Sequence, residues 1–255
     1  MWKLVGILSV VLAGAATAQQ AADAVAPEAA GAGAFEGLPA GIAAALDAKA
    51  AGKPFLASDW MIAAANPHAV KAGADVLAVG GTAADALVAV QVVLGLVEPQ
   101  SSGLGGGAFL VWYDAATGEV TTLDGRETAP LEATPRLFQD AEGEPLKFFD
   151  AVVGGRSVGT PGTPALLAEA YQKWGSAPWR SLLEPAIALA EEGFVVSPRL
   201  AGLVAGDAER LASSDTTSAY FMPGGQPVAA GTLLKNPAYA ETLRRFAREG
   251  ANAFY

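Results

Sequence analysis

The sequence predicts an α+β fold in which helices cover a β-sheet, in a layered αββα arrangement. Three observations lead to this fold class. Two adjacent helical patterns occupy residues 67–79 and 83–97, and the second is apolar on nearly all sides, as expected of a helix buried inside a layered fold. A hairpin pattern follows over residues 108–123. Further helical patterns then fill most of the remaining chain.

The first two helices carry recognisable start signals. Asn66 is a favoured capping residue, and Pro67 fits the first helical position, where the missing N–H of proline is not needed. Thr82 precedes the second helix and Asp85 follows three residues later, which predicts a capping box. Pro99 ends this helix, because proline disrupts a helix interior. A well-defined helix pair should therefore precede the hairpin.

Alternation and helical periodicity place the hairpin and the elements after it. Strands are predicted at residues 108–113 and 119–123, joined by a turn, and a polar loop then runs to about residue 155. The later helices are expected at residues 164–174, 179–192, 198–212 and 237–249.

The N-terminal region has the composition of a secretory signal. Lys3 precedes an apolar stretch over residues 4–15, and residues 16–18 fit the small-x-small cleavage pattern. We therefore expect a cleaved signal peptide at residues 1–18 and a secreted or periplasmic protein, with a retained membrane anchor as the alternative. Residues 19–58 are rich in Ala, Gly and Pro, which predicts a linker with one weak helix at residues 42–50. The compact domain should then occupy residues 59–255.

Composition argues against several functions. The formal net charge is −10 and no basic run is present, so nucleic acid is not an expected partner. Cysteine is absent, which excludes disulfides, thiolate catalysis and cysteine-ligated metals. The single histidine, His68, stands near a predicted helix start, where packing or surface roles are more common than catalysis. We predict no metal site and no cofactor.

A serine nucleophile is a competing hypothesis. Residues 155–159 match the Gly-x-Ser-x-Gly pattern, with Ser157 at its centre. That motif needs a strand before the serine and a helix directly after it, whereas Pro161 and Pro164 interrupt an immediate helix. His68 also lies upstream, although this class of hydrolase places its histidine downstream. We therefore favour a chance match in a Gly-rich loop.

A second Gly-rich segment, residues 103–107, superficially resembles a phosphate-binding loop. Such loops run from a strand through glycines into a helix, so that the helix N-terminus faces the anion. Here the predicted order is helix, loop, strand, and no Gly-Lys-Ser/Thr sequence follows. We expect these glycines to serve close backbone packing.

Arg126 is the candidate binding residue. It follows a predicted strand, in a short loop, between Gly125 and Glu127. Arginine recognises carboxylates through two parallel, charge-assisted hydrogen bonds. A fixed positive charge at a strand end suits an acidic ligand, but a local ion pair with Glu127 or Asp124 explains the residue equally well.

Several motifs, taken in order, resemble the γ-glutamyltransferase (glutathione hydrolase) family. The likeness covers roughly residues 60–255 and suggests the N-terminal part of the family's large subunit. The matching segments are residues 65–69, residues 80–86 with the pattern Gly-Gly-x-Ala-x-Asp-Ala, the glycine loop at 99–107, residues 124–130 with Arg-Glu-x-Ala-Pro, residues 159–162 and residues 253–255.

The resemblance implies a precursor of the N-terminal-nucleophile hydrolase class, whose layered αββα fold would be incomplete in this chain. Members of the family cleave themselves before a threonine, which becomes the N-terminus of the small subunit. The threonine hydroxyl attacks the γ-glutamyl carbonyl, and its own amine can serve as base. The γ-glutamyl-enzyme then reacts with water or with an amino-acid or peptide acceptor.

By the same resemblance, Arg126 would hold the α-carboxylate of glutathione or another γ-glutamyl donor. The threonine nucleophile is expected beyond Tyr255, so these 255 residues would need the small subunit of the same precursor and would be inactive alone. A related acylase with another acyl donor is the first alternative. A non-catalytic secreted binding protein on the same scaffold is the second.

Overall fold

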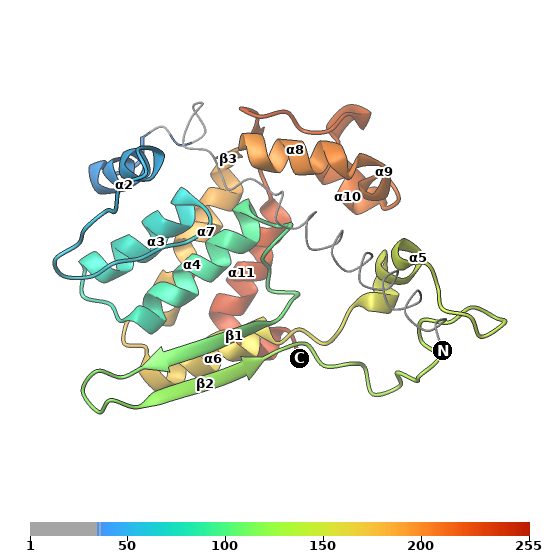
Figure 1. Ribbon diagram of the computed structural model, residues 1–255, viewed down its shortest axis with the longest axis horizontal. Coiled ribbons are helices and arrows are strands. Elements are labelled where there is room, and N and C mark those ends of the chain that lie inside the picture. Colours follow the sequence, from blue (N-terminus) through green and yellow to red (C-terminus); the bar gives the residue numbers. More distant parts are fainter. Residues whose placement is uncertain (1–34, 36) are drawn as a thin grey trace, which may run out of the picture.

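A computed structural model of the chain describes residue 35 and residues 37–255, so the predicted signal peptide and the first part of the linker lie outside the described residues. Helices and strands are mixed, as the predicted α+β class requires (Figure 1). The elements are α2 (Ala40–Ala50), α3 (Pro67–Ala78), α4 (Ala83–Val97), β1 (Ala108–Tyr113), β2 (Val120–Gly125), α5 (Phe148–Val152), η1 (Gly155–Ser157), α6 (Thr163–Trp174), α7 (Trp179–Glu192), β3 (Phe194–Val195), α8 (Pro198–Gly206), α9 (Ala208–Leu211), α10 (Asp215–Phe221), η2 (Pro223–Gly225), β4 (Leu233–Leu234), α11 (Pro237–Glu249) and η3 (Gly250–Ala253).

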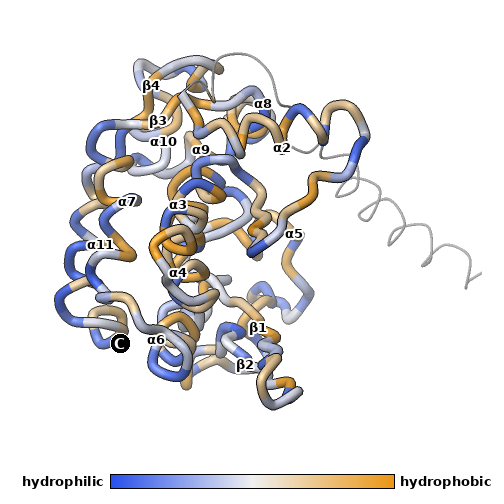
Figure 2. The backbone as a smooth tube through the Cα atoms, turned by 90° about the vertical axis from the view of Figure 1, so that its left-hand side faces the viewer, coloured by the Kyte–Doolittle hydropathy of each residue, from blue (hydrophilic) through white to orange (hydrophobic). Residues whose placement is uncertain are grey.

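Helix α4 forms the centre of the core. It packs against α3, α6 and α7, and α11 packs against α7 and reaches α4 through Tyr239, whose hydroxyl donates to the Val92 carbonyl (Figure 1). The hydropathy view shows α4 as an apolar segment in the middle of the molecule, beside the more mixed α3 (Figure 2). Val88, Val92, Val93 and Leu96 of α4 are buried, which confirms the prediction of a helix surrounded by protein. No helix in the described part of the chain is long and apolar enough to cross a bilayer.

The predicted helix caps are present. The Asn66 side chain accepts a hydrogen bond from the backbone N–H of His68 at 3.0 Å. The Thr82 hydroxyl accepts from the N–H of Asp85 at 3.1 Å, and Oδ2 of Asp85 accepts from the N–H of Thr82 at 2.9 Å, which completes the capping box. The weak helix predicted in the linker is also present, as α2.

Asp85 has a second role that its capping position does not predict. Its carboxylate is buried and also accepts hydrogen bonds from the backbone N–H groups of Ser176 and Ala177, in the turn between α6 and α7. Burial alone would raise the pKa of Asp85, but the N–H donors of Thr82, Ala177 and Ser176 favour the charged form and lower it below its ordinary value. The start of α4 is thereby tied to the α6–α7 turn.

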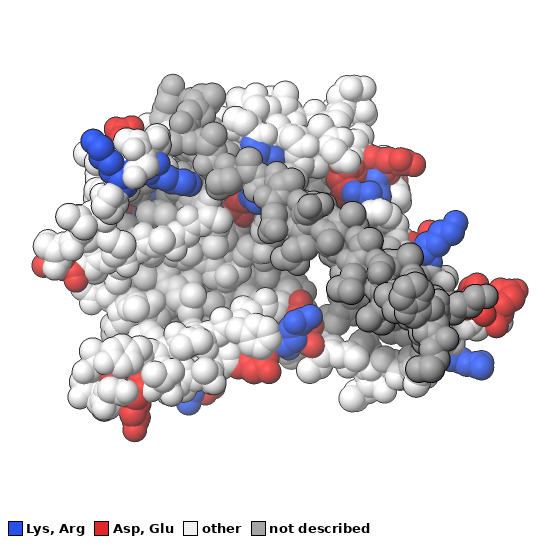
Figure 3. All heavy atoms as spheres, in the orientation of Figure 1, with Lys and Arg blue, Asp and Glu red and all other residues white. Residues whose placement is uncertain are grey.

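The hairpin has one covered face and one exposed face. Strands β1 and β2 are antiparallel, with Ala108 opposite Gly125 and Tyr113 opposite Val120. The inner face lies on α6, where the rings of Trp112 and Trp174 stack with their centroids 4.5 Å apart. The outer face carries exposed apolar side chains and is largely uncharged (Figure 3). These outer residues are Phe109, Val111, Tyr113 and Val120.

Some elements differ from the predictions. The described residues contain two two-stranded sheets, β1–β2 and β3–β4, so the wider layered sheet is not assembled in them. The loop predicted to extend to residue 155 contains α5 and the start of η1, and the helix predicted at residues 198–212 divides at Asp207 into α8 and α9. Helix α10 and the two-residue strands β3 and β4 were not predicted, because such short segments give little periodic signal.

Residues 126–161, which we call the arm, leave the body and return to the same place. The arm projects to the right of the body in Figure 1 and contains α5. Its two ends meet: a Cβ built on Gly162 would lie 2.0 Å from the carbonyl oxygen of Gly125. Thr128 and Thr160 also form an antiparallel bridge across the stem. Arg126 is the first residue of the arm.

Candidate functional site

Arg126 stands where β2 ends and the arm begins. Its backbone N–H donates to Oδ1 of Asp124 at 2.9 Å, which fixes the turn after the strand. The guanidinium remains accessible, since 72% of the side chain is exposed. It lines a cavity of about 420 Å³ together with Leu123 of β2, Thr128 of the arm and Glu169 of α6. A mobile ligand could reach this charge directly.

The local ion pair considered from the sequence is also present. Oε2 of Glu127 lies 3.3 Å from Nε of Arg126. A contact through Nε leaves the Nη1–Nη2 edge of the guanidinium available for a second carboxylate. The local ion pair and a ligand-binding role are therefore compatible. Glu127 can orient the Arg126 side chain and still leave the outer edge of the guanidinium free to bind a carboxylate.

The glycine loop, residues 103–107, lies on the other side of Glu127. It lines a polar cavity of about 550 Å³ with Gln91, Ser102 and Glu127. A Cβ built on Gly107 would lie 2.4 Å from Oε2 of Glu127 and 2.8 Å from the backbone carbonyl oxygen of Gly125, so a larger residue would force these groups to shift. The loop runs from α4 into β1, in the predicted order helix, loop, strand. Gly106 and Gly107 therefore pack beside the Glu127 carboxylate, whereas a Cβ on Gly105 would meet nothing within 4 Å.

One carbonyl connects the glycine loop to helix α6. The oxygen of Gly106 accepts hydrogen bonds from the N–H of Gly162 at 3.0 Å, from the N–H of Thr163 at 3.1 Å and from the Thr163 hydroxyl at 3.1 Å. Gly162 is the N-cap of α6 and has no side chain to satisfy the first N–H groups of the helix. The loop carbonyl supplies the missing cap.

A buried polar cluster at the base of the loop was not predicted. Glu98, at the end of α4, is buried and forms an ion pair with Arg199 of α8. Its carboxylate also accepts from the side-chain amides of Asn66 at 3.1 Å and Gln100 at 2.6 Å. In the sequence, the cluster is marked only by a carboxylate between an apolar helix and Pro99. Its ion-pair partner, Arg199, is 101 residues further along the chain. The cluster joins three helices where the loop begins.

The structure does not support a serine nucleophile at position 157. Ser157 belongs to a 3₁₀ turn that follows helix α5, instead of the strand–turn–helix context that a nucleophile elbow needs. Its hydroxyl donates to the carbonyl of Val152 at 2.7 Å. His68 lies in the first turn of α3, with its ring edge-on to Phe35, and lines neither cavity beside Arg126.

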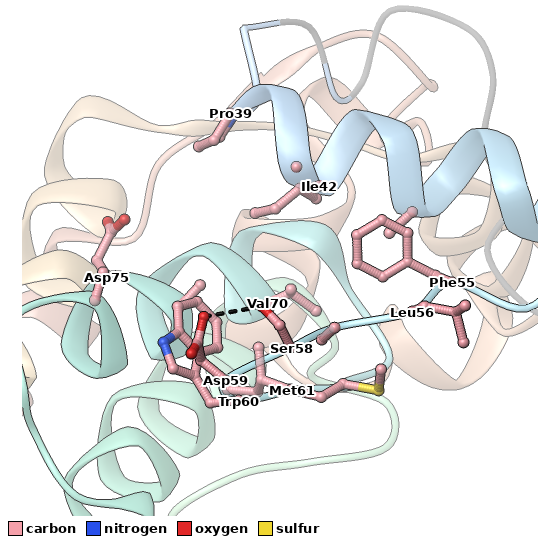
Figure 4. Close-up of a pocket in the computed structure, with 16 residues that line it drawn as sticks. Pro39, Ile42, Phe55, Leu56, Ser58, Asp59, Trp60, Met61, Val70 and Asp75 are labelled. Atoms are coloured by element: carbon pink, nitrogen blue, oxygen red, sulfur yellow. Dashed lines mark hydrogen bonds between the residues drawn. The ribbon is translucent and has the colours of Figure 1, made fainter.

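An apolar groove of about 500 Å³ lies elsewhere, between α2, residues 55–62 and α3 (Figure 4). Ile42, Phe55 and Trp60 are among the side chains around it. Its polar groups include Ser58, which donates to Asp59 at 3.0 Å, and Asp75 on α3. Among the described residues that line this groove, none is basic.

Comparison with known proteins establishes the family to which the chain belongs. The sequence profile of the gamma-glutamyltranspeptidase family matches residues 69–255. The chain therefore belongs to this family, and both Arg126 and the glycine loop lie inside the matched region.

Individual relatives agree with this membership. A glutathione hydrolase proenzyme of Bacillus subtilis (strain 168) is 42% identical over 197 residues, which cover 77% of this chain and 33% of the relative. An acylase ACY 1 proenzyme of Pseudomonas sp. (strain V22) is 37% identical over 80% of this chain and 37% of its own length. The crystal structure of Helicobacter pylori gamma-glutamyltranspeptidase superposes with a TM-score of 0.76 at 34% identity, over 79% of this chain and 58% of that one. The chain spans about a third of the length of the curated relatives it matches.

Proposed function

We propose that the full-length protein carrying this chain transfers the γ-glutamyl group of glutathione and related γ-glutamyl compounds to water or to amino-acid and peptide acceptors. Family membership supports the proposal, as do curated relatives named glutathione hydrolase at 37% to 42% identity. The structural observation that carries it is Arg126, an accessible arginine at a strand end beside a cavity and a glycine loop.

Arg126 binds the α-carboxylate of the donor in this proposal. The outer edge of its guanidinium can make two parallel hydrogen bonds to a carboxylate, while Glu127 holds the Nε side. The α-carboxylate of a γ-glutamyl compound is three carbon atoms away from the carbonyl that reacts. Arg126 therefore positions the donor and takes no part in bond making or breaking.

The nucleophile is proposed to be a threonine outside these 255 residues, at the start of a small subunit released from the same precursor. Its hydroxyl attacks the γ-carbonyl and its α-amine accepts the proton. The tetrahedral intermediate expels the donor's amine, which takes up a proton, and leaves a γ-glutamyl ester. Water or an acceptor amine then attacks the ester and frees the threonine.

We further propose that the rest of the precursor completes a layered αββα fold on the outer face of the hairpin. Phe109 is 65% exposed and Val111 is 73% exposed on this face. Apolar side chains alternating on one face of a pair of strands are typical of a surface that packs against another layer. Hydroxyl-radical labelling of Phe109 and Tyr113 should be strong in the isolated chain and weak in the full-length protein. Equal labelling in both would contradict the proposal.

Secretion is proposed from the sequence of residues 1–18, with residues 19–58 as a linker before the compact domain. Secreted protein should begin at Gln19 when its N-terminus is determined by mass spectrometry. A mature chain that still contains Lys3 would contradict the cleaved signal peptide.

The central test is made on the full-length protein. Mass spectrometry should find two chains, the smaller beginning with threonine, and the processed protein should release glutamate from glutathione. Replacement of that threonine by alanine should abolish both self-cleavage and turnover. A protein that stays in one piece, or that releases no glutamate, would overturn the proposed function.

An acylase with a different acyl donor is the second candidate, because acylase relatives align over as much of this chain as the hydrolases do. Three anilides separate the two functions: γ-glutamyl anilide, glutaryl anilide without the ammonium group, and 4-aminobutyryl anilide without the α-carboxylate. Preference for γ-glutamyl anilide supports the first function. Preference for glutaryl anilide supports an acylase that still uses the arginine.

A further inference from the structure

A short series of contacts leads from Thr163, the first residue of α6, to Arg126. The Thr163 hydroxyl donates to the carbonyl of Gly106, on the glycine loop. The next residue of that loop, Gly107, packs against the carboxylate of Glu127. Oε2 of Glu127 in turn lies 3.3 Å from Nε of Arg126. Thr163 is 1% exposed, so neither solvent nor substrate reaches it.

Glu127 lies between two glycines that leave room for its side chain, which is 33% exposed. On one side, a Cβ on Gly107 would lie 2.4 Å from its Oε2. On the other side, a Cβ on Gly159 would lie 2.9 Å from the Cβ of Glu127. The carboxylate therefore sits between the glycine loop and the returning end of the arm. A shift of the loop would change the space beside the Glu127 carboxylate and, through the ion pair, the preferred orientation of the arginine.

The base of the loop has its own anchors, independent of Thr163. The backbone N–H groups of Ser101 and Ser102 donate to the carbonyl of Glu98, and Gln91 donates to the Ser102 hydroxyl at 2.7 Å. The end next to Glu127 is held by the bonds from α6 to the Gly106 carbonyl and by the pairing of Ala108 with Gly125 at the start of the hairpin. Loss of the Thr163 hydroxyl should therefore loosen only the part of the loop that touches Glu127.

We propose that Thr163 is a positioning residue for Arg126, acting through Gly106, Gly107 and Glu127, and so sets the affinity for donors that carry an α-carboxylate. This inference rests on the proposed γ-glutamyl transfer and adds a residue that never touches the substrate. Loss of the hydroxyl leaves two N–H donors on the Gly106 carbonyl, so the expected effect is that of one hydrogen bond.

The test compares Thr163→Val with wild type in the full-length processed protein. KM for γ-glutamyl anilide should rise about threefold to tenfold, which is the range for one lost hydrogen bond, with kcat within about twofold. Turnover of 4-aminobutyryl anilide, which lacks the α-carboxylate, should not change. Thr163→Ser keeps the hydroxyl and should restore KM to near the wild-type value.

Two further comparisons separate positioning from stability. Thr82→Val removes a capping hydroxyl from the opposite end of α4 and should lower the melting temperature without changing KM. If Thr163→Val does not fold, Thr163→Ala is compared with Thr163→Ser, since both lack the methyl group and differ only in the hydroxyl. The Ala variant should then show the raised KM.

The outcomes distinguish this inference from the proposed function. The positioning role is overturned if wild type is active but the Thr163 variants lose turnover of γ-glutamyl anilide and 4-aminobutyryl anilide equally, or lose turnover of neither. Either result leaves γ-glutamyl transfer standing. A wild type with no turnover of γ-glutamyl donors overturns the proposed function, and the positioning role falls with it.

Discussion

The region around α4 and the region around Arg126 differ in whether their side chains find partners within this chain. The buried carboxylates of Asp85 and Glu98 find their partners within this chain. On the outer face of the hairpin and around Arg126, apolar and charged groups remain exposed. The buried carboxylates of the first region thus have partners within this chain, whereas the second region exposes the apolar and charged groups on which the proposed function rests. Stability should therefore depend on the first region and activity on the second.

Two phenylalanines give the largest expected contrast. Phe246 of α11 is fully buried, with its ring edge-on to Trp179 at 5.0 Å. Phe246→Ala should destabilise the purified chain by about 3–5 kcal/mol, whereas exposed Phe109→Ala should change it by less than about 0.5 kcal/mol. Urea unfolding measures both. In the full-length protein, the proposed further layer would cover Phe109. The same substitution should then lower the free energy of unfolding by more than about 1 kcal/mol, the low end for truncating a partly covered side chain. Equal costs for both variants in the purified chain would remove the contrast between the two regions.

Asp85→Asn should have the next largest effect, about 2–4 kcal/mol, because it removes a buried carboxylate that accepts several hydrogen bonds. Folding lowers the pKa of Asp85, so its contribution is complete above the unfolded pKa of about 4 and is lost as pH falls through the lower folded pKa. The gap between wild type and variant should therefore narrow below about pH 4. Asp75→Asn, which breaks an exposed pair with Lys71, is the control and should cost at most about 0.5 kcal/mol.

Arg126→Ala should lower kcat/KM for glutathione by roughly tenfold to a few hundredfold, from the loss of a charge-assisted pair. Most of the loss should fall in KM, and self-cleavage should continue, because the α-carboxylate is remote from the reacting bond. Arg126→Lys should recover only part of the lost kcat/KM, since an ammonium group cannot make both parallel hydrogen bonds. If 4-aminobutyryl anilide loses as much turnover as γ-glutamyl anilide, Arg126 is structural and the site assignment is wrong.

Ser157→Ala should have the smallest effect. The hydroxyl of Ser157 donates to the nearby carbonyls of Val152 and Gly154, so kcat/KM should stay within about twofold of wild type. A serine hydrolase would instead lose turnover while self-cleavage stayed normal. This single assay decides between the two nucleophiles.

Local signals predicted much of this structure, and distant partners explain what they missed. The caps at Asn66 and Thr82, and the hairpin, depend on neighbouring residues, so the sequence displays them directly. The ion pair of Glu98 with Arg199 joins residues 101 positions apart, which no local pattern reveals. The layered sheet stays a prediction, because the strands that would complete it are not among the described residues.

At the candidate site, sequence motifs identified Arg126 and the glycine loop, and spacing left the Glu127 ion pair as an open alternative. The structure places all three together. The Gly106 carbonyl that caps α6 was not predicted, since Gly162 offers no capping side chain and the acceptor lies 57 residues before Thr163. Helix caps of this kind depend on the tertiary fold and leave no sequence signature.

The arm leaves the body at Gly125 and returns at Gly162, and these two residues touch. Insertions or deletions between the ends therefore need not move either end. Doubling the length of such a loop adds only about 0.6 kcal/mol to the free energy of closing it. Arm length can thus diverge among homologues while Arg126 and Glu127 keep their place at the stem. The same property makes the outer arm a suitable position for an epitope tag or a small inserted domain.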